Sequence, residues 1–269
     1  MKIWKYLFLF LGLATLTIWS AVFLSPDGKF HLIACDVGEG DAILITYKNI
    51  QILTDGGPNN KVVDCLAKHL PFWDRKIEAV ILTHPDTDHY RGLIEVSKRY
   101  QIEKFIYNGQ EVSTSDFQVL KKGVGGLQKT FSGAKIRAGM IRLDILSPKE
   151  MVKDGQTNDN SVVTLVNFGN FKALLTGDAP FSVLDNLETV ETVNYIKISH
   201  HGSKTGTDED TIQKFLPKIA VISVGRNNYG HPDAGVLELI EKINITVLRT
   251  DELGSVEIIT NGQAIWLKK

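Results

Sequence analysis

The sequence predicts an α/β protein whose sheets are covered by helices, and three observations support this fold class. Apolar runs of strand length alternate with segments of helical periodicity from Phe30 onward. Most of these runs are apolar throughout, which is typical of strands buried on both faces. A pattern of strand, tight turn, strand and acidic residue occurs at Asp41–Gly57 and again at Ser161–Asp178. This repeat indicates two similar halves packed face to face, with a site at their shared edge.

Each apolar run bounded by turn residues is a predicted strand, and each segment of helical spacing is a predicted helix. The strands are Phe30–Cys35, Ala42–Tyr47, Ile50–Leu53, Ala79–Thr83, Lys104–Tyr107, Val162–Asn167, Phe171–Leu175, Tyr195–Ile198, Ala220–Val224 and Ile245–Leu248, with a closing pair at Val256–Thr260 and Ala264–Leu267. The helices are Val62–His69, His89–Tyr100, Pro180–Leu187, Asp208–Phe215 and Gly235–Ile243. The stretch Gly123–Gly133 lacks the Gly-Lys-Ser/Thr ending of a phosphate loop, so we interpret it as a flexible loop.

Composition limits the class of protein and its partners. The chain has 269 residues, of which 43% are hydrophobic, so it can bury a sizeable core. This length fits one large α/β domain or two small ones. The net charge is −1 and the pI about 6.7. Because there is no global basic field to hold a long polyanion, any contact with nucleic acid must be local.

The N-terminal segment predicts a membrane anchor. Tyr6–Leu24 has no charged residue over 19 positions and follows Lys2 and Lys5. A spanning helix needs about 20 apolar residues, and basic residues on the short side predict that this end is cytoplasmic. A cleaved signal peptide is the alternative, but Trp19–Val22 is a poor cleavage site. We expect an anchor or signal segment over residues 1–28 and one domain over residues 29–269, outside the cytoplasm and attached to the membrane, or secreted.

The two cysteines predict neither a metal site nor a disulfide framework. Cys35 and Cys65 are too few for a disulfide-rich fold and lack the paired spacing of a zinc ribbon. We therefore interpret both as buried thiols.

The most informative segment is Thr83–Gly92, which holds four potential metal ligands within six positions. They are His84, Asp86, Asp88 and His89. A predicted strand precedes them and a predicted helix follows, so their side chains emerge together at the edge of a sheet. Helix capping explains one aspartate but not two histidines flanking two aspartates. Imidazole nitrogen with carboxylate oxygen suits zinc, manganese or iron better than calcium, so the sequence predicts a metal site.

Three later clusters also follow predicted strands, where sites in such sheets are built. They are Asp178 after Phe171–Leu175, His200-His201 after Tyr195–Ile198, and His231 after Ala220–Val224. Five of the seven histidines thus lie in loops after strands. His31 and His69 do not, and we interpret them as ordinary surface or core histidines.

Taken in order, these motifs resemble those of the metallo-β-lactamase superfamily. The order is Asp55, His84-x-Asp86-x-Asp88-His89, Asp178 and His200-His201-Gly202-Ser203. Residues 35–42 (Cys-Asp-Val-Gly-Glu-Gly-Asp-Ala) resemble the opening DVGQGDA signature of the branch fused to ComEC-type DNA-uptake proteins, and Tyr229-Gly230-His231-Pro232 resembles a later one. The resemblance covers about residues 30–269 and implies a sandwich of two mixed β-sheets flanked by helices. The multi-span channel region of those proteins does not occur in this sequence, so we do not expect a transport role.

The resemblance also implies a dinuclear metal centre. His84 and Asp86 would bind the first ion, with help from Asn158 or Asn160. The second ion would be bound by Asp88, by His89 and by one of His200 or His201. Asp178 would bridge both ions. Asp55 would orient the metal loop through hydrogen bonds. The sequence departs from the usual ligand pattern of the superfamily in two places. Asp86 replaces the usual histidine, and no histidine lies between His89 and Asp178. Both differences give the first metal ion fewer nitrogen ligands and more oxygen ligands. We expect two divalent ions, with zinc favoured and manganese as the alternative.

Together these features predict a metal-dependent hydrolase that acts on a phosphodiester, with DNA among the candidate substrates. Two ions about 3.5–4 Å apart would acidify a bridging water and clamp the attacking and leaving oxygens. Asp88 and His231 are the expected catalytic residues, His231 as a proton donor or phosphoryl contact. The alternatives are a lactonase or β-lactamase-type hydrolase and a membrane-tethered binding module without catalysis. The sequence indicates no protein partner.

Overall fold

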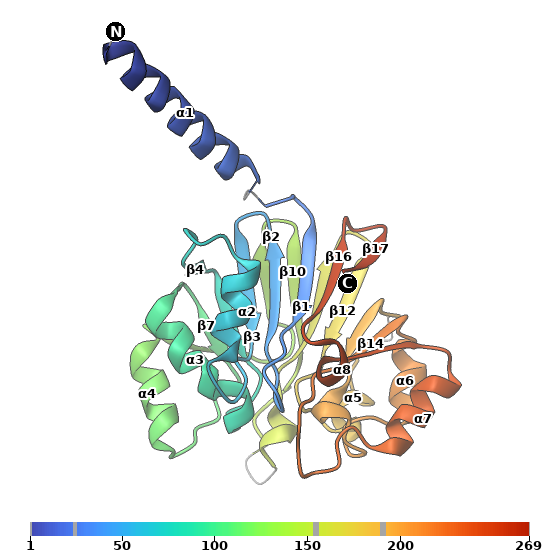
Figure 1. Ribbon diagram of the computed structural model, residues 1–269. Coiled ribbons are helices and arrows are strands. Elements are labelled where there is room, and N and C mark those ends of the chain that lie inside the picture. Colours follow the sequence, from blue (N-terminus) through green and yellow to red (C-terminus); the bar gives the residue numbers. More distant parts are fainter. Residues whose placement is uncertain (1, 24–25, 153–155, 189–191, 269) are drawn as a thin grey trace.

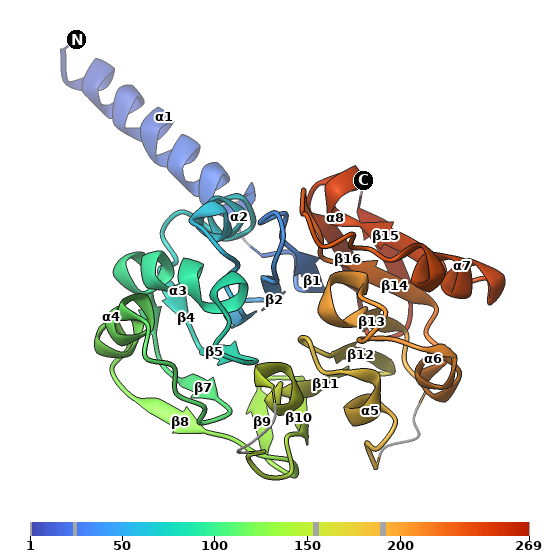
Figure 2. The same ribbon diagram turned by 90° about the horizontal axis from the view of Figure 1, so that it is seen from below.

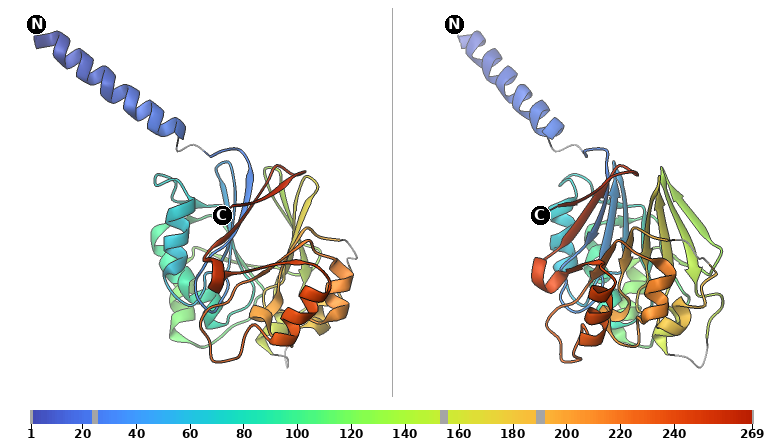
Figure 3. Two further views of the ribbon diagram at one scale, coloured as in Figure 1. Left: turned by 45° about the vertical axis from the view of Figure 1, so that its right-hand side comes forward. Right: turned by 90° about the vertical axis from the view of Figure 1, so that its right-hand side faces the viewer.

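The computed structural model describes residues 2–23, 26–152, 156–188 and 192–268. Leu24, the last residue of the predicted membrane span, lies outside the described residues. Two β-sheets pack face to face and helices cover their outer surfaces (Figures 1 and 3), which confirms the predicted fold class.

The first sheet has eight strands in the order β17-β16-β1-β2-β3-β5-β7-β8. In chain order they are β1 (Phe30–Ala34), β2 (Ile43–Tyr47), β3 (Ile50–Thr54), β5 (Ala79–Leu82), β7 (Phe105–Tyr107), β8 (Leu127–Lys129), β16 (Val256–Thr260) and β17 (Ile265–Lys268). Its helices are α2 (Lys61–His69), α3 (Thr87–Arg99) and α4 (Ser115–Gly123), and the short pair β4 (Lys76–Ile77) and β6 (Gln101–Ile102) lies beside them.

The second sheet has seven strands in the order β15-β14-β13-β12-β11-β10-β9. They are β9 (Lys135–Ala138), β10 (Ile141–Ser147), β11 (Val163–Phe168), β12 (Phe171–Leu175), β13 (Tyr195–Lys197), β14 (Ile219–Ile222) and β15 (Thr246–Arg249). The helical segments of this half are α5 (Phe181–Leu184), α6 (Glu209–Phe215), α7 (Ala234–Lys242) and α8 (Thr250–Leu253), with the 3-10 turns η1 (Thr157–Asn160) and η2 (Ser199–Gly202).

The central core lies between the two sheets. Phe30 on β1 stacks on Phe168 of β11 with ring centroids 4.9 Å apart, and Tyr47 meets the same ring edge-on. Further apolar layers fill the space between each sheet and its helices. Burial on both faces explains why the central strands are apolar throughout rather than alternating.

The internal repeat predicted from the sequence appears in the topology. The hairpin β2–β3 continues into the parallel strand β5, and the hairpin β11–β12 continues into the parallel strand β13. In both halves the carboxyl ends of the parallel strands lie at the same end of the sandwich, which Figure 2 views directly. The loops that follow those strands therefore meet there.

Helix α1 (Lys2–Phe23) leaves the molecule at the opposite end (Figure 1). Its window Ile3–Ser20 has a mean hydropathy of 1.4 and is not buried against the rest of the protein. By length and composition it is the one helix among the described residues that could cross a membrane.

The sequence missed several polar or short elements. Strands β8, β9 and β10 and helix α4 lie where no element was predicted, and the interpretation of Gly123–Gly133 as a flexible loop was wrong, because α4 ends at Gly123 and β8 occupies Leu127–Lys129. Conversely, the helix predicted over Pro180–Leu187 is only the single turn α5. The edge strands β8 and β9 escaped notice because they are short and partly polar, and the longer β10 because charged residues interrupt its apolar ones.

The interpretation of Cys35 and Cys65 as thiols was also wrong, because they form a disulfide with a Cα–Cα distance of 5.9 Å. Cys35 follows β1 and Cys65 lies on α2, which packs on the outer face of the first sheet. The two cysteines are 30 residues apart in the sequence, and no local sequence pattern indicates that they pair. Only the fold brings their sulfur atoms together. Disulfides persist mainly in oxidising compartments.

Candidate metal centre

The metal loop connects β5 to α3 and is fixed by Asp55, which follows β3. One Asp55 oxygen accepts a hydrogen bond from the Thr83 amide at 2.8 Å. The other accepts from the Thr83 hydroxyl at 2.7 Å and lies 2.9 Å from Nδ1 of His89. This carboxylate therefore holds the His89 ring with Nε2 directed away from Asp55, the usual role of an acidic residue behind a metal-binding histidine.

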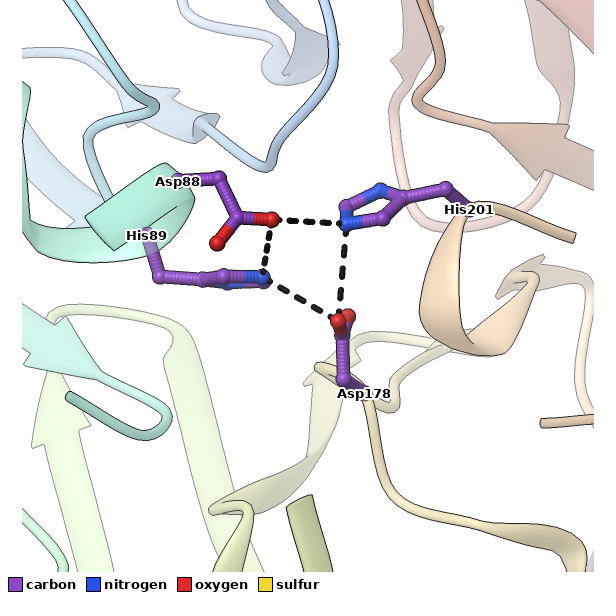
Figure 4. Close-up of side chains that lie close together, drawn as sticks. All are labelled: Asp88, His89, Asp178 and His201. Carbon is purple, nitrogen blue, oxygen red and sulfur yellow. Dashed lines mark hydrogen bonds and ion pairs between the residues drawn. The ribbon is translucent and has the colours of Figure 1, made fainter. Parts of the chain in front are cut away.

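Four side chains from both halves of the molecule converge on one point (Figure 4). Asp88 and His89 come from the first turn of α3, Asp178 follows β12, and His201 lies in η2; we call these four the metal cluster. Nε2 of His201 is 3.2 Å from Asp88 and 3.4 Å from Asp178, and Nε2 of His89 is 3.3 Å from Asp178. The four candidate ligand atoms all lie within 4.8 Å of one another.

The two adjacent histidines do not alternate in direction as neighbours on a strand would, because they lie in the turn η2. Both have left-handed backbone angles, with φ of 52° at His200 and 55° at His201. His201 is buried, and its Nδ1 contacts the Ser223 carbonyl at 2.9 Å, which directs Nε2 into the metal cluster. His200 stays partly exposed at the rim, with Nε2 3.9 Å from Asp178.

The residues predicted for a first metal ion lie beside the cluster. His84 is fully buried, with Nδ1 3.0 Å from the Thr83 hydroxyl and Nε2 3.6 Å from Asp86. Asp86 also accepts a hydrogen bond from Thr157, which the sequence did not single out.

Of the two asparagines offered for the first ion, the structure brings only one near. Asn158 lies 3.5 Å from Nδ1 of His200. Both polar atoms of the buried Asn160 side chain bond the backbone of Val152 instead, so Asn160 was a wrong choice of ligand. The backbone turn of η1, rather than the spacing along the chain, decides which amide faces the site.

The donor set fits a divalent transition metal. Nε2 of His84 and Nε2 of His89 are buried and have no hydrogen-bond partner in the described part of the chain. An unpartnered buried nitrogen is unfavourable unless a ligand satisfies it. Both nitrogens lie beside carboxylates, and imidazole with carboxylate is a donor combination typical of zinc, manganese or iron sites.

Comparison with known proteins identifies the family. The family model described as "Metallo-beta-lactamase superfamily" matches residues 35–226, the segment that contains every member of the metal cluster. The chain belongs to this superfamily. Its members are generally metal-dependent hydrolases. Among solved structures, the metallo-β-lactamase fold protein YhfI of Bacillus subtilis aligns with a TM-score of 0.60 at 12% identity, covering 86% of this chain and all of the other.

Curated relatives place this metallo-β-lactamase domain in the competence branch. ComE operon protein 3 of Bacillus subtilis is 29% identical over 87% of this chain, and Recombination protein 2 of Haemophilus influenzae is 31% identical over 83%. The aligned region covers 33% and 28% of those two proteins. The chain therefore corresponds to about a third of the length of the relatives it matches.

Electrostatic coupling within the metal cluster is strong. Burial alone would lower the pKa of His201, but Asp178 and Asp88 outweigh it and raise that pKa to about 10. Burial would raise the pKa of Asp178, but His201, His89 and Lys197 outweigh it and hold that pKa well below its usual range. The cluster thus favours positive charge at its centre, and a divalent ion would displace the histidine protons on binding.

A buried lysine behind the metal cluster was missed from the sequence. Lys197 on β13 is 1% exposed, forms an ion pair with Asp41, lies 3.3 Å from Asp178 and donates to the Gly177 carbonyl at 2.9 Å. It fixes Asp178 from the side opposite the cluster histidines. The available signal was a single charge in the otherwise apolar run Tyr195–Ile198, since lysine is almost never fully buried without a partner.

The loop of residues 36–42 packs directly against the metal loop. A side chain at Gly40 would lie 2.3 Å from the Asp88 carbonyl, and the backbone there has a φ of 138°, so only glycine fits. This contact brings Glu39 to the site, where Oε1 is 3.3 Å from Nδ1 of His231. The other oxygen of Glu39 accepts from the Gly225 amide at 3.0 Å.

A cavity of about 420 Å³ opens over the metal cluster. Its wall includes Glu39, Asp86, His200, Tyr229 and His231. The rings of Tyr229 and His231 stack with centroids 5.8 Å apart, and Tyr229 is 79% exposed at the mouth. The cavity can admit a small group to the cluster while the rest of a larger substrate stays outside.

Proposed function

We propose that this protein is a metal-dependent phosphodiesterase whose active site is the cavity over the metal cluster. The observation that best supports this function is the convergence of Asp88, His89, Asp178 and His201 within 4.8 Å beside two buried, unpartnered histidine nitrogens. In the proposal, these four residues hold one divalent ion. His84, Asp86 and the shared Asp178 hold a second, with Asn158 and His200 at its margin.

When bound, the metal ions supply Lewis acidity and an activated water. The residues of the chain supply the rest. Asp55 and Ser223 fix the ring orientations of His89 and His201. Glu39 engages Nδ1 of His231, so Nε2 is the atom free to reach a substrate, where it would protonate a leaving oxygen or contact a phosphoryl oxygen.

The charge of the site favours a phosphodiester over a neutral ester. Asp86, Asp88 and Asp178 face the cavity, so an anionic substrate can enter only when divalent ions offset these carboxylates. Two divalent ions held by these three carboxylates leave a net positive metal centre, because the fourth carboxylate of the wall, Glu39, contacts His231 and the Gly225 amide instead. A positive centre attracts a phosphodiester anion. The names of the curated relatives, which refer to competence and recombination, make DNA a candidate substrate.

We further propose that residues 1–28 anchor the protein in the cytoplasmic membrane and that the hydrolase domain, residues 29–269, lies outside the cytoplasm. Lys2 and Lys5, in the first turn of α1, lie at the short N-terminal end of the apolar span and favour this orientation. The disulfide between Cys35 and Cys65 adds independent support, because such bonds persist in oxidising compartments. External protease added to spheroplasts should degrade the domain while cytoplasmic markers survive. Full protection of the domain from the protease would show that it lies in the cytoplasm instead. Release of the domain into the medium would indicate a cleaved signal peptide.

Activity after metal reconstitution tests the proposed reaction. Chelator-treated full-length protein is loaded with zinc or manganese and assayed on bis(p-nitrophenyl) phosphate, a lactone and a β-lactam. We expect phosphodiester cleavage that Asp88→Asn abolishes and that Asp64→Asn, on the outer surface of α2, leaves intact. Lactone or β-lactam cleavage without phosphodiesterase activity would favour the alternative hydrolase, and metal binding without any turnover would favour a binding module.

A further inference from the structure

A second cavity lies at the end of the molecule from which α1 emerges. Strand β3 begins at Ile50 beside this cavity and ends at Thr54 beside the metal loop, so about 13 Å of extended strand separates these two residues. The cavity has a volume of about 290 Å³ and is bounded by Pro26 to Lys29, the β2–β3 turn and the end of α2. We call it the anchor-side pocket.

The chain itself holds this pocket at the membrane surface if α1 spans the bilayer, as proposed above. Helix α1 ends at Phe23 and Pro26 already lines the pocket. Three residues can span at most about 10 Å even when fully extended. The 22 residues of α1 give a helix about 33 Å long, close to the thickness of the hydrocarbon core. The pocket must therefore lie at the depth of the lipid headgroups.

The rim of the anchor-side pocket is basic. Lys29, Lys48, Lys68 and Lys268 line it and are all exposed. Its acidic members are Asp27 and Glu257, and Glu257 is already engaged by His31 at 2.7 Å and by Lys268 at 3.0 Å. Four lysines thus face two carboxylates, and the pocket has a net positive charge suited to a phosphate.

Two buried acceptors inside the pocket lack partners. Oε1 of Gln51 and Nε2 of His69 have no hydrogen bond in the described part of the chain, although Gln51 is only 1% exposed. Nδ1 of His69 faces Glu257 at 3.5 Å, so its proton belongs there and Nε2 is left as an acceptor. Two unpartnered acceptors behind a cationic rim match a ligand with hydroxyl donors next to a phosphate.

An exposed aromatic pair adjoins the pocket. Phe72 is 72% exposed and Trp73 49%, with ring centroids 4.9 Å apart, and they follow Leu70 and Pro71 in the pocket wall. Tryptophan is enriched where proteins meet the headgroup layer, because its ring is apolar and carries one polar group, and the apolar ring of Phe72 extends this surface. Figure 1 shows the connection between α2 and β4, which contains both residues, at the same end of the molecule as the base of α1.

We propose that the anchor-side pocket binds the headgroup of an anionic, hydroxyl-bearing glycerophospholipid in the membrane that holds α1. Lys29, Lys48, Lys68 and Lys268 contact the phosphate. Gln51 and His69 accept from the headgroup hydroxyls, and Phe72 and Trp73 enter the interface. The bound lipid fixes the domain with the metal cluster facing away from the bilayer. This inference rests on the proposed membrane anchor.

Lysine labelling of the full chain in lipid nanodiscs tests the pocket. The discs contain phosphatidylcholine alone, or with one third phosphatidylglycerol or phosphatidylserine, and acetylation rates are read by mass spectrometry. We expect phosphatidylglycerol to slow labelling of the four pocket lysines about threefold or more, and 0.5 M salt to restore it. Lys122 on α4 and Lys242 on α7 are exposed and do not line the pocket, so their labelling should not change. Phosphatidylserine, which lacks headgroup hydroxyls, should protect less.

Charge-reversal variants provide matched controls. In Lys48→Glu/Lys68→Glu, phosphatidylglycerol should no longer protect Lys29 and Lys268, whereas Lys122→Glu/Lys242→Glu should behave like the wild type. Equal labelling in neutral and phosphatidylglycerol discs would overturn the proposal, and equal protection by phosphatidylserine would overturn the hydroxyl contacts. Protection by soluble glycerol 3-phosphate in neutral discs would assign the pocket to a free ligand instead. Failure of the proposed anchor is distinguishable, because the protein would then not incorporate into any disc.

Discussion

The two ends of the sandwich contain the same residue types and use them differently. At the metal end, His84 and His89 keep buried Nε2 atoms without hydrogen-bond partners beside several carboxylates. At the anchor end, both ring nitrogens of His31 are bonded, to Glu257 and to Asp27. Histidine and carboxylate side by side therefore do not define a metal site. Unpartnered atoms alone do not define one either, since Nε2 of His69 at the anchor end also lacks a hydrogen bond in the described part of the chain. The deciding feature is whether several ligand atoms converge within metal-binding distance, and among the described residues both such groups lie at the metal end.

Substituting one histidine at each end gives the largest expected contrast. Removing a positioned proton donor reduces turnover by about 10²–10⁴-fold, so His231→Ala should lose that much phosphodiesterase activity. Its metal content should not change, because His231 lies outside the metal cluster. The matched variant His69→Ala should keep full turnover. Steady-state kinetics with elemental analysis measures both, and a parallel loss of metal in His231→Ala would make His231 a ligand.

The two lysine–carboxylate pairs should differ strongly in their contribution to stability. Breaking a buried ion pair by removing one partner costs about 3–5 kcal/mol. Metal-free Lys197→Met should therefore unfold more easily by about that amount, because the buried Asp41 loses its nearest cation and keeps only the more distant rings of His201 and His89. Lys268 is 56% exposed beside Glu257, and Lys268→Met should cost less than about 1 kcal/mol. Denaturant unfolding measures the free energy of unfolding of both variants. An equal loss of stability in the two variants would contradict the distinction between the two ends.

Within the metal end, His201 and His200 should separate by metal affinity. His201 is buried in the metal cluster, whereas Nε2 of His200 is 3.9 Å from Asp178 at the rim. Loss of an outer contact typically costs about 10–100-fold in affinity. We expect His200→Ala to reduce metal affinity by an amount at the lower end of that range, and His201→Ala to reduce it by more than the upper end. Competition with a chromophoric chelator measures both affinities. The reverse order would exchange their roles.

The smallest effect concerns acid stability at the anchor end. Burial would raise the pKa of Glu257, but hydrogen bonds from His31 and Lys268 outweigh it and lower that pKa to about 2. The pKa of Glu257 in the folded state thus lies below its value of about 4.5 in the unfolded state. The ionised Glu257 carboxylate therefore stabilises the fold above about pH 4.5, and this contribution is lost as the pH falls toward 2. Because solvent screens this partly exposed group, we expect the free energy of unfolding to fall by on the order of 1 kcal/mol. Glu257→Gln should flatten this part of the pH–stability curve, and an unchanged curve would contradict it.

The sequence predicted the fold and most of the metal end because those residues follow apolar strands, whose ends share one edge by topology. Asp178 and the His200-His201 pair are examples. What it missed depends on contacts distant in the chain. The partners of Lys197 and Cys65 come from other elements, and the left-handed backbone of His200 and His201 decides which ring enters the cluster. The anchor-side pocket was missed for the same reason, since His31, His69 and Glu257 are near only in space.

The most direct test of the metal cluster is the metal content of the full-length protein, measured by elemental mass spectrometry after loading and desalting. We expect about two divalent ions per wild-type chain, a large loss of metal in Asp178→Ala, and no loss in Glu257→Gln at the other end. A wild-type content near zero, or one that Asp178→Ala leaves unchanged, would contradict the assignment of the metal cluster.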